Sequence, residues 1–247
     1  MRYISTFILI TSAALLLTAC GKEGDRPADP APATLGDAQS PAKAKQAVQA
    51  QQSAAAPRGD KSVPLENYQE LKSGRQLLYA FLAASPLPVD FDKVAQDISQ
   101  PYARERDEFK KRDLLAALKP AVEAEVAKAK AQKYYYMTMG RSNVVDKYDF
   151  TEKAFAIPEL RDGDGYHYFN DIHSYQLGFS NAKAFGALKV PDEETARMIE
   201  GLRSQYDQLT LRVYFFANDT ELGSTRLKGE IMHVQLLDRH GKVLAEQ

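Results

Sequence analysis

Apolar residues between positions 64 and 84 recur mostly at three- and four-residue spacings, the period of one helix face. Pro64 suits the first position of a helix, where a backbone N–H has no intrahelical partner. Pro86 and Pro88 follow, and proline cannot continue a helix. We therefore predict a first helix over 64–84, with these apolar positions: Leu65, Tyr68, Leu71, Leu77, Leu78, Phe81 and Leu82.

Two further helical segments precede residue 132. Asp90 can cap a short helix whose apolar positions lie between Phe91 and Ile98. Residues 102–131 form the longest helical stretch, and we expect Pro120 to kink or divide it. The mixed charges of 104–112 indicate the solvated outside of that helix, with a charged binding face as the alternative.

Aromatic and β-branched residues then recur in short runs separated by Gly, Asp and Pro, which predicts strands. Alternation over 209–217 predicts a strand with one side in the core. Residues 238–241 have the composition of a hairpin turn, with Gly241 able to take a positive φ. The predicted strands are 133–140, 148–157, 166–173, 176–179, 209–218, 227–237 and 243–245, and one helix, 191–202, interrupts them.

Helices first and adjacent strands afterwards predict an α+β fold, with N-terminal helices followed by a mainly antiparallel β-sheet and one interrupting helix. This order argues against a βαβ array and its nucleotide chemistry. We expect residues 64–247 to form a single globular domain.

The first twenty residues have the pattern of an export signal. Met1 and Arg2 give a positive end, and the apolar run 3–17 is shorter than the roughly 20 residues of a membrane-spanning helix. Leu17-Thr18-Ala19-Cys20-Gly21 follows, and it resembles the lipobox of bacterial lipoproteins. Residues 1–19 are then a cleaved signal peptide; the alternative is an ordinary secretory signal that happens to end at Cys20.

The resemblance implies a diacylglyceryl group on the Cys20 sulfur and an acylated new N-terminus. Several acyl chains hold a protein firmly in a membrane. Gly21 is not the aspartate that, in many Gram-negative lipoproteins, signals retention at the inner membrane. The resemblance therefore implies a cell-envelope location, at the outer membrane facing the periplasm if the host is Gram-negative.

Residues 20–63 are expected to be a disordered tether. Among residues 21–63 there is no aromatic residue, and Leu35, Val48 and Val63 are the only larger aliphatic ones. A coil of this length spans roughly 35 Å. The alternative is that 43–52 folds against a partner.

Composition removes several classes of function. The formal net charge is −1 without a long run of one sign, so nucleic acid is not expected as a partner. Cys20 is the only cysteine, so the domain has no disulfide and no thiolate chemistry. The sequence predicts no cofactor.

Candidate metal ligands are few. If 166–173 is one strand, Asp171 and His173 share a face about 6.6 Å apart, close enough to hold one ion. A solvent-facing or hydrogen-bonded pair is the alternative. The run 162–165 has alternate aspartates and glycines, but Leu160 occupies the first ligand position of an EF-hand loop in that register, so it indicates a turn.

A hydrolase is the competing hypothesis. The segment 178–182 differs from the nucleophile-elbow pattern by ending in Ala182, and Asp219 and His233 follow Ser180 in hydrolase order. The parallel βα framework of that motif is not predicted. We therefore assign no catalytic residue, and an envelope hydrolase or metal-dependent enzyme using Asp171, His173 or Ser180 remains the alternative.

Four tyrosines carry the binding hypothesis. Tyr134 and Tyr136 share a strand face, and Tyr166 and Tyr168 share another. Tyrosine offers a large amphipathic contact area at low entropy cost, which suits docking of a protein or glycan. Core packing is the alternative. We expect a non-catalytic binding or scaffolding module for an envelope protein or a cell-wall ligand such as peptidoglycan.

Overall fold

The structure is a computed structural model that describes residues 48, 51, 57–140, 144–163, 165–206 and 209–247. The α+β prediction is confirmed, because helices come first and a mainly antiparallel sheet follows. The helices are α2 (Gly74–Ala84), α3 (Phe91–Ile98), α4 (Gln100–Arg104), α5 (Glu108–Ala131), α6 (Pro158–Arg161) and α7 (Glu193–Ser204), with 3-10 turns η2 (Leu65–Asn67) and η3 (Ala182–Phe185).

Ten strands lie in two sheets within the described residues. The main sheet has the order β1-β2-β8-β9-β6-β5, and β10 also pairs with β9; the small sheet has the order β3-β4-β7. The strands are β1 (Gln69–Glu70), β2 (Tyr134–Gly140), β3 (Tyr148–Asp149), β4 (Ala154–Ala156), β5 (Tyr166–Phe169), β6 (Ile172–Phe179), β7 (Ala187–Lys189), β8 (Thr210–Thr220), β9 (Arg226–Leu237) and β10 (Val243–Glu246).

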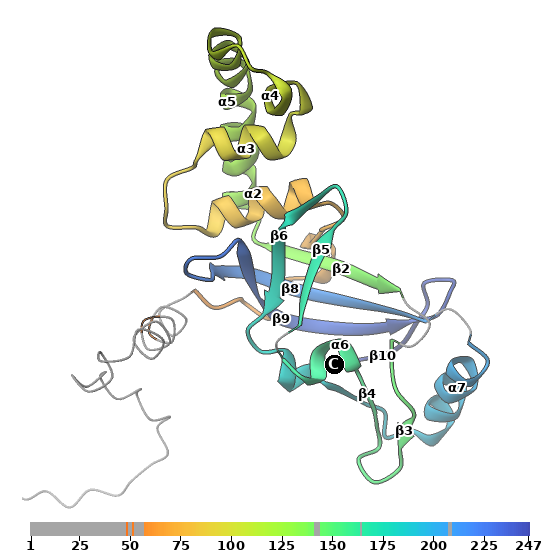
Figure 1. The fold of residues 1–247 in the computed structure, drawn as a ribbon. Helices are drawn as coiled ribbons and strands as arrows, with labels where there is room; N and C mark the ends of the chain where they lie inside the picture. The colour runs from red at the N-terminus through yellow and green to blue at the C-terminus, as the bar shows by residue number, and fades with distance from the viewer. Residues whose placement is uncertain (1–47, 49–50, 52–56, 141–143, 164, 207–208) are drawn as a thin grey trace, which may run out of the picture.

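The main sheet is strongly coiled. Two of its pairs, β1–β2 and β6–β9, are parallel, and the others are antiparallel. Figure 1 shows β6 and β5 rising across the direction of the long strands β2, β8 and β9, with α2 beside them. The helices α3 and α4 and the start of α5 stand beyond α2, away from the sheet, and α5 runs back past α2 toward β2 (Figure 1). The sheet therefore has an inner face, which we define as the side that packs against α2.

The inner face carries the main hydrophobic core. Leu211, Val213 and Phe215 of β8 are fully buried there, as their alternation predicts. Leu77 and Leu78 of α2 complete the packing from the helix side. Burying such side chains contributes roughly 1.5–3 kcal/mol each to folding.

The outer face is also buried in part, so the prediction that only one side of 209–217 lies in the core is wrong. Tyr214 and Phe216 join Tyr68 and Met232 in a second, smaller cluster, which we call the outer cluster. The tyrosine ring at position 68 meets that of Tyr214 edge-on, with centroids 5.3 Å apart. The cover for this face comes from the segment that precedes α2, not from another layer of helices.

That segment begins earlier than expected. Residues 57–63, assigned to the tether by their composition, lie on the sheet. The Gly59 N–H donates to Glu230 at 3.0 Å, and the Asp60 N–H donates to the Tyr134 hydroxyl at 2.9 Å. A Cβ at Gly59 would lie 2.8 Å from the Cβ of Phe216, which is fixed by the β8 backbone, so glycine lets the chain come this close. The described residues that precede the boundary predicted at residue 64 are therefore part of the domain.

The helix predicted over 64–84 begins only at Gly74. Tyr68 and Leu71 are buried as predicted, but they belong to an extended segment in which the Leu71 N–H donates to the carbonyl of Tyr136 at 2.8 Å. Ser73 caps α2 by accepting from the N–H of Gln76. Apolar residues at helical spacing thus belong to two different parts of the fold, the helix α2 and the extended segment before it.

Pro120 was predicted to kink or divide its helix, and it does not divide it. The helix α5 runs unbroken from Glu108 to Ala131 and is separated from α4 at Glu105, where α4 is capped. Pro120 and Ala116, whose carbonyl loses its donor, are both exposed, so water can solvate that carbonyl. Other local predictions are confirmed: Asp90 caps α3 by accepting from Lys93, and Gly241 has a φ of 80° in its turn.

Two predicted strands are hairpins instead. Residues 148–157 contain β3 and β4, joined by a turn in which Lys153 has a positive φ of 49°. Residues 166–173 contain β5 and the start of β6, because Phe169 pairs with Ile172 across a two-residue turn. Asparagine and aspartate, at positions 170 and 171, are residues that tolerate such turns.

Candidate functional site: a groove between two strand edges

Strand β5 presents its tyrosines to solvent. Tyr166 and Tyr168 are 49% and 55% exposed, and their ring centroids lie 6.5 Å apart. His167, between them, turns inward, with its ring 5.8 Å from that of Phe179. The alternation predicted for this strand is confirmed over Tyr166–Phe169.

A neighbouring arginine orients the first of these tyrosines. The Arg226 guanidinium lies 5.2 Å from the ring centroid of Tyr166, within the range of a cation–π interaction. Arg226 also pairs with Glu221 at 3.3 Å. Gly178 stands opposite Tyr166 in the ladder, and a Cβ there would lie 3.2 Å from the Arg226 side chain. The absence of a side chain at Gly178 thus lets Arg226 lie across the strand.

A groove of about 350 Å³ runs beside these tyrosines. Consecutive residues of two strands line it, and Glu159 of α6 closes one side. Because successive side chains of a strand point to opposite faces, a cavity lined by consecutive residues is bounded by the edge of the strand. The groove is lined by Met137, Thr138, Met139 and Gly140 of β2, and by Tyr166, His167, Tyr168, Phe169 and Asn170 of β5 and its turn.

Both edges are open in the described part of the chain. On the side of β2 away from β8, the partner β1 reaches only Tyr135 and Tyr136. The Tyr136 carbonyl accepts from Leu71 on that side, whereas the Lys133 carbonyl accepts from Ala217 of β8. By alternation, the backbone groups of Thr138 point away from β8. The sheet order ends at β5 on its other side. Open edges of this kind are templates for pairing with another strand.

The other predicted tyrosine pair has a different place. Tyr134 packs between Tyr68 and Phe216, with ring centroids at 5.2 and 5.0 Å. Tyr136 packs on Tyr214 at 5.5 Å and lies under the guanidinium of Arg212. These two residues support the outer cluster. The structure therefore does not bring the four tyrosines together as one platform, and only the β5 pair borders the groove.

The Asp171 carboxylate caps a helix. Its two oxygens accept the backbone N–H groups of Gly74 and Arg75, at 2.7 and 3.2 Å, at the start of α2. Burial acts to raise the pKa of Asp171, but these hydrogen bonds outweigh it and leave the pKa below its ordinary value. His173 is exposed on β6. Among the described residues, no group of three or more His, Cys, Asp or Glu side chains could hold a metal ion together.

The residues of the hydrolase hypothesis have separate partners. The Ser180 hydroxyl donates to the Gly229 carbonyl at 3.3 Å. His233 lies 3.2 Å from Glu246, on β10. The Asp219 carboxylate accepts the N–H of Thr220 at 2.7 Å. Ser180, Asp219 and His233 thus follow one another in the order of a hydrolase triad, but each makes a different local contact.

Cys20, the predicted signal peptide and most of the predicted tether lie outside the described residues. Within the residues that the structure does describe, no helix is both long and apolar enough to span a membrane. Comparison with protein-family models, curated proteins and solved structures found no match.

Sequence reasoning missed the groove itself. It identified Tyr166 and Tyr168 but not Thr138. The position of Thr138 in the groove depends on where β1 ends and on how far the sheet coils, which the local sequence does not indicate.

Proposed function

We propose that this protein is a lipid-anchored, non-catalytic module of the cell envelope that binds an extended segment of a partner protein along the groove between β2 and β5. The resemblance of residues 17–21 to a lipobox supports the anchor. Acyl chains on Cys20 attach the protein to a membrane, the outer membrane facing the periplasm in a Gram-negative host, and the chain between Cys20 and residue 57 provides reach.

One observation carries the binding role: two open strand edges border the same groove. An extended peptide can add a strand to such an edge, with main-chain hydrogen bonds supplying affinity and side-chain contacts supplying specificity. Four residues of β2 border the groove, so about 13 Å of partner strand fits along it at roughly 3.3 Å per residue. The exposed rings of Tyr166 and Tyr168 provide the side-chain contacts.

A peptide suits this groove better than a glycan. The groups that the edges present are backbone donors and acceptors at the spacing of a β-ladder, which an extended polypeptide matches and a sugar chain does not. A cell-wall ligand such as peptidoglycan is therefore the competing outcome of the experiment.

The test places a photo-reactive amino acid at Tyr168 of the full chain in living cells and identifies captured molecules by mass spectrometry. The matched control position is Tyr206, which is 76% exposed and follows α7. We expect one recurrent protein from position 168 and not from position 206, cross-linked through a short segment of its chain.

Two variants then test the mode of binding. Thr138→Pro removes an N–H that faces the groove without cutting the ladder to β8, and proline is tolerated on open edges. Thr138→Val changes the side chain but keeps that N–H. We expect capture to be lost with proline and kept with valine, while thermal melting shows both variants folded. Equal capture by both folded variants, or capture of glycan fragments alone, would falsify edge pairing.

The anchor is tested separately. Replacing Cys20 with serine removes the lipid-accepting sulfur, so we expect the protein to leave the membrane fraction. A protein that stays in that fraction contradicts lipidation as the means of attachment, whatever the groove binds.

A further inference from the structure

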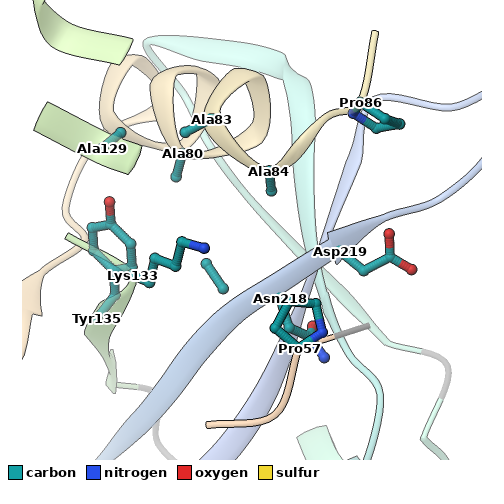
Figure 2. Close-up of a pocket in the computed structure, with 11 residues that line it drawn as sticks. Pro57, Ala80, Ala83, Ala84, Pro86, Ala129, Lys133, Tyr135, Asn218 and Asp219 are labelled. Atoms are coloured by element: carbon teal, nitrogen blue, oxygen red, sulfur yellow. The ribbon is translucent and has the colours of Figure 1, made fainter. Parts of the chain in front are cut away.

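A second cavity, of about 300 Å³, lies between the helices and the main sheet. It is formed where the C-terminal parts of α2 and α5 approach the start of β2 and the far part of β8 (Figure 2). Four alanines, Ala80, Ala83, Ala84 and Ala129, form its helical wall. Their side chains end at Cβ, so the helices leave space above the sheet.

The opposite wall is polar. Lys133, which directly precedes β2, and Tyr135 of β2 line this side, and Figure 2 shows the Lys133 amine directed toward the middle of the cavity. Asn218 and Asp219 enter from β8. The ladder between β8 and β9 has a bulge between Ala217 and Asp219. A bulge redirects side chains, which explains how neighbouring residues of one strand line the same cavity.

One polar atom beside the cavity, the side-chain oxygen of Asn218, lacks a hydrogen-bond partner in the described part of the chain. This oxygen is buried. A buried amide oxygen is stabilised only when a donor reaches it. The β8 side of the cavity thus fits a ligand that donates N–H groups. The nearby carboxylate of Asp219 favours a ligand whose donor group is positively charged.

The β2 side has the complementary chemistry. Lys133 supplies a cation, and the Tyr135 hydroxyl is a donor, since burial raises the pKa of Tyr135 to about 12 and keeps it protonated. Donors on one side and acceptors on the other, with small apolar residues between, match a molecule that has a negative and a positive end joined by a compact apolar body.

We propose that this cavity binds a small zwitterion of the amino-acid or dipeptide type, with its carboxylate on Lys133 and Tyr135 and its ammonium on Asn218 and Asp219. The cavity is separate from the groove between β2 and β5. The proposal therefore goes beyond the proposed function and does not depend on it.

The test titrates the full chain, in detergent, with L-alanyl-L-alanine by ligand-observed NMR. Two blocked forms of the dipeptide test its two charged ends separately: the N-acetyl form lacks the ammonium and the C-terminal amide lacks the carboxylate. A charge-assisted hydrogen bond corresponds to roughly a tenfold or greater change in affinity. We expect each blocked form to bind about tenfold more weakly than the free dipeptide.

Single substitutions test which residues bind each charged end of the dipeptide. Lys133→Met should weaken the free dipeptide about tenfold and leave the affinity for the amide unchanged, because the amide lacks the group that Lys133 recognises. Ala84→Leu should abolish binding by filling the cavity. Lys110→Met, an exposed lysine at the far end of α5, is the control and should change nothing.

Three results would each contradict the proposal. No saturable binding of the free dipeptide up to about 10 mM overturns the proposal. So does equal binding of all three forms, or unchanged binding by Ala84→Leu in a variant that thermal melting shows to be folded.

Discussion

The two faces of the main sheet are buried in different ways. On the inner face, helices and the hairpin of β5 and β6 cover a core that includes Phe215, Leu77 and Leu177, all fully buried. On the outer face, the segment before α2 contributes Tyr68 and covers three buried residues of the sheet, Tyr214, Phe216 and Met232. Adjacent residues of β8 thus lie under covers of different thickness. The inner face has a thick layer of helices, and the outer face has a thin layer formed by one segment of chain. The difference teaches that alternation in a strand indicates which residues share a face, but not how much covers it.

Phe215→Ala should have the largest effect. Phe215 is fully buried and packs against Phe179 and Tyr135, with ring centroids at 5.5 and 5.9 Å. Removing it leaves a cavity in the thick layer, so we expect a loss of about 3–5 kcal/mol in the free energy of unfolding, measured by urea denaturation. Phe150→Ala, at a residue 82% exposed, is the control and should stay within about 0.5 kcal/mol.

Phe216→Ala tests the thin layer at the next residue. The site can collapse onto the covering segment, so we expect a loss of about 2 kcal/mol, below the range for a core phenylalanine. Hydrogen exchange of residues 57–70 should also speed up before the rest of the protein responds. A loss equal to that of Phe215→Ala, with no local change in exchange, would show that the two faces are not distinct layers.

Asp171→Ala tests the attachment of α2 to the inner layer. Losing the carboxylate that accepts from Gly74 and Arg75 should cost about 1 kcal/mol near neutral pH. The pKa of this carboxyl is lowered in the fold, so its contribution is fully present above the ordinary value of 3.8 and is lost as pH falls through the lower folded-state pKa.

The stability difference between wild type and Asp171→Ala should therefore shrink in acid, as followed by denaturation at several pH values. Asp171→Asn keeps a neutral acceptor and serves as the control, since its contribution should not depend on pH. A difference that grows as the pH falls contradicts the capping role.

Arg58→Ala should have the smallest effect. Its guanidinium lies 3.2 Å from Glu230, but the arginine side chain is largely exposed, and exposed ion pairs contribute little. We expect less than about 0.5 kcal/mol in urea denaturation. The Gly59 N–H keeps Glu230 paired in the variant. A loss above about 1 kcal/mol would contradict this expectation and indicate that the ion pair itself helps to hold residues 57–63 on the sheet.

The long strands were the most predictable part of the fold. The predicted range 227–237 differs from β9 by one residue, because turns with a positive-φ glycine, Gly223 and Gly241, lie beyond its two ends. The turn at Asn170 and Asp171 was missed because two polar residues between Phe169 and Ile172 also fit an alternating strand. The helix at 64–73 was wrong because Tyr68 and Leu71 suit either period, and tertiary contacts with Tyr136 and Tyr214 decided between them.

The candidate site was predictable only as single residues. Tyr166 and Tyr168 follow from local sequence, but the open edge at Thr138 depends on β1 ending after two residues of pairing. Asp171 was assigned to a possible ion because its true partners, the N–H groups of Gly74 and Arg75, are far away in the sequence. Backbone partners of this kind leave no mark on composition or spacing.

The contacts of residues 58–60 determine where a mechanical load enters the domain. A pull from the N-terminal side reaches Glu230 of β9 and Tyr134 of β2 before it reaches α2. Both strands lie inside the main sheet, next to β8, where long ladders share the force among many hydrogen bonds. Tension from the N-terminal side is therefore carried by the main sheet before it reaches α2 and the helices beyond it.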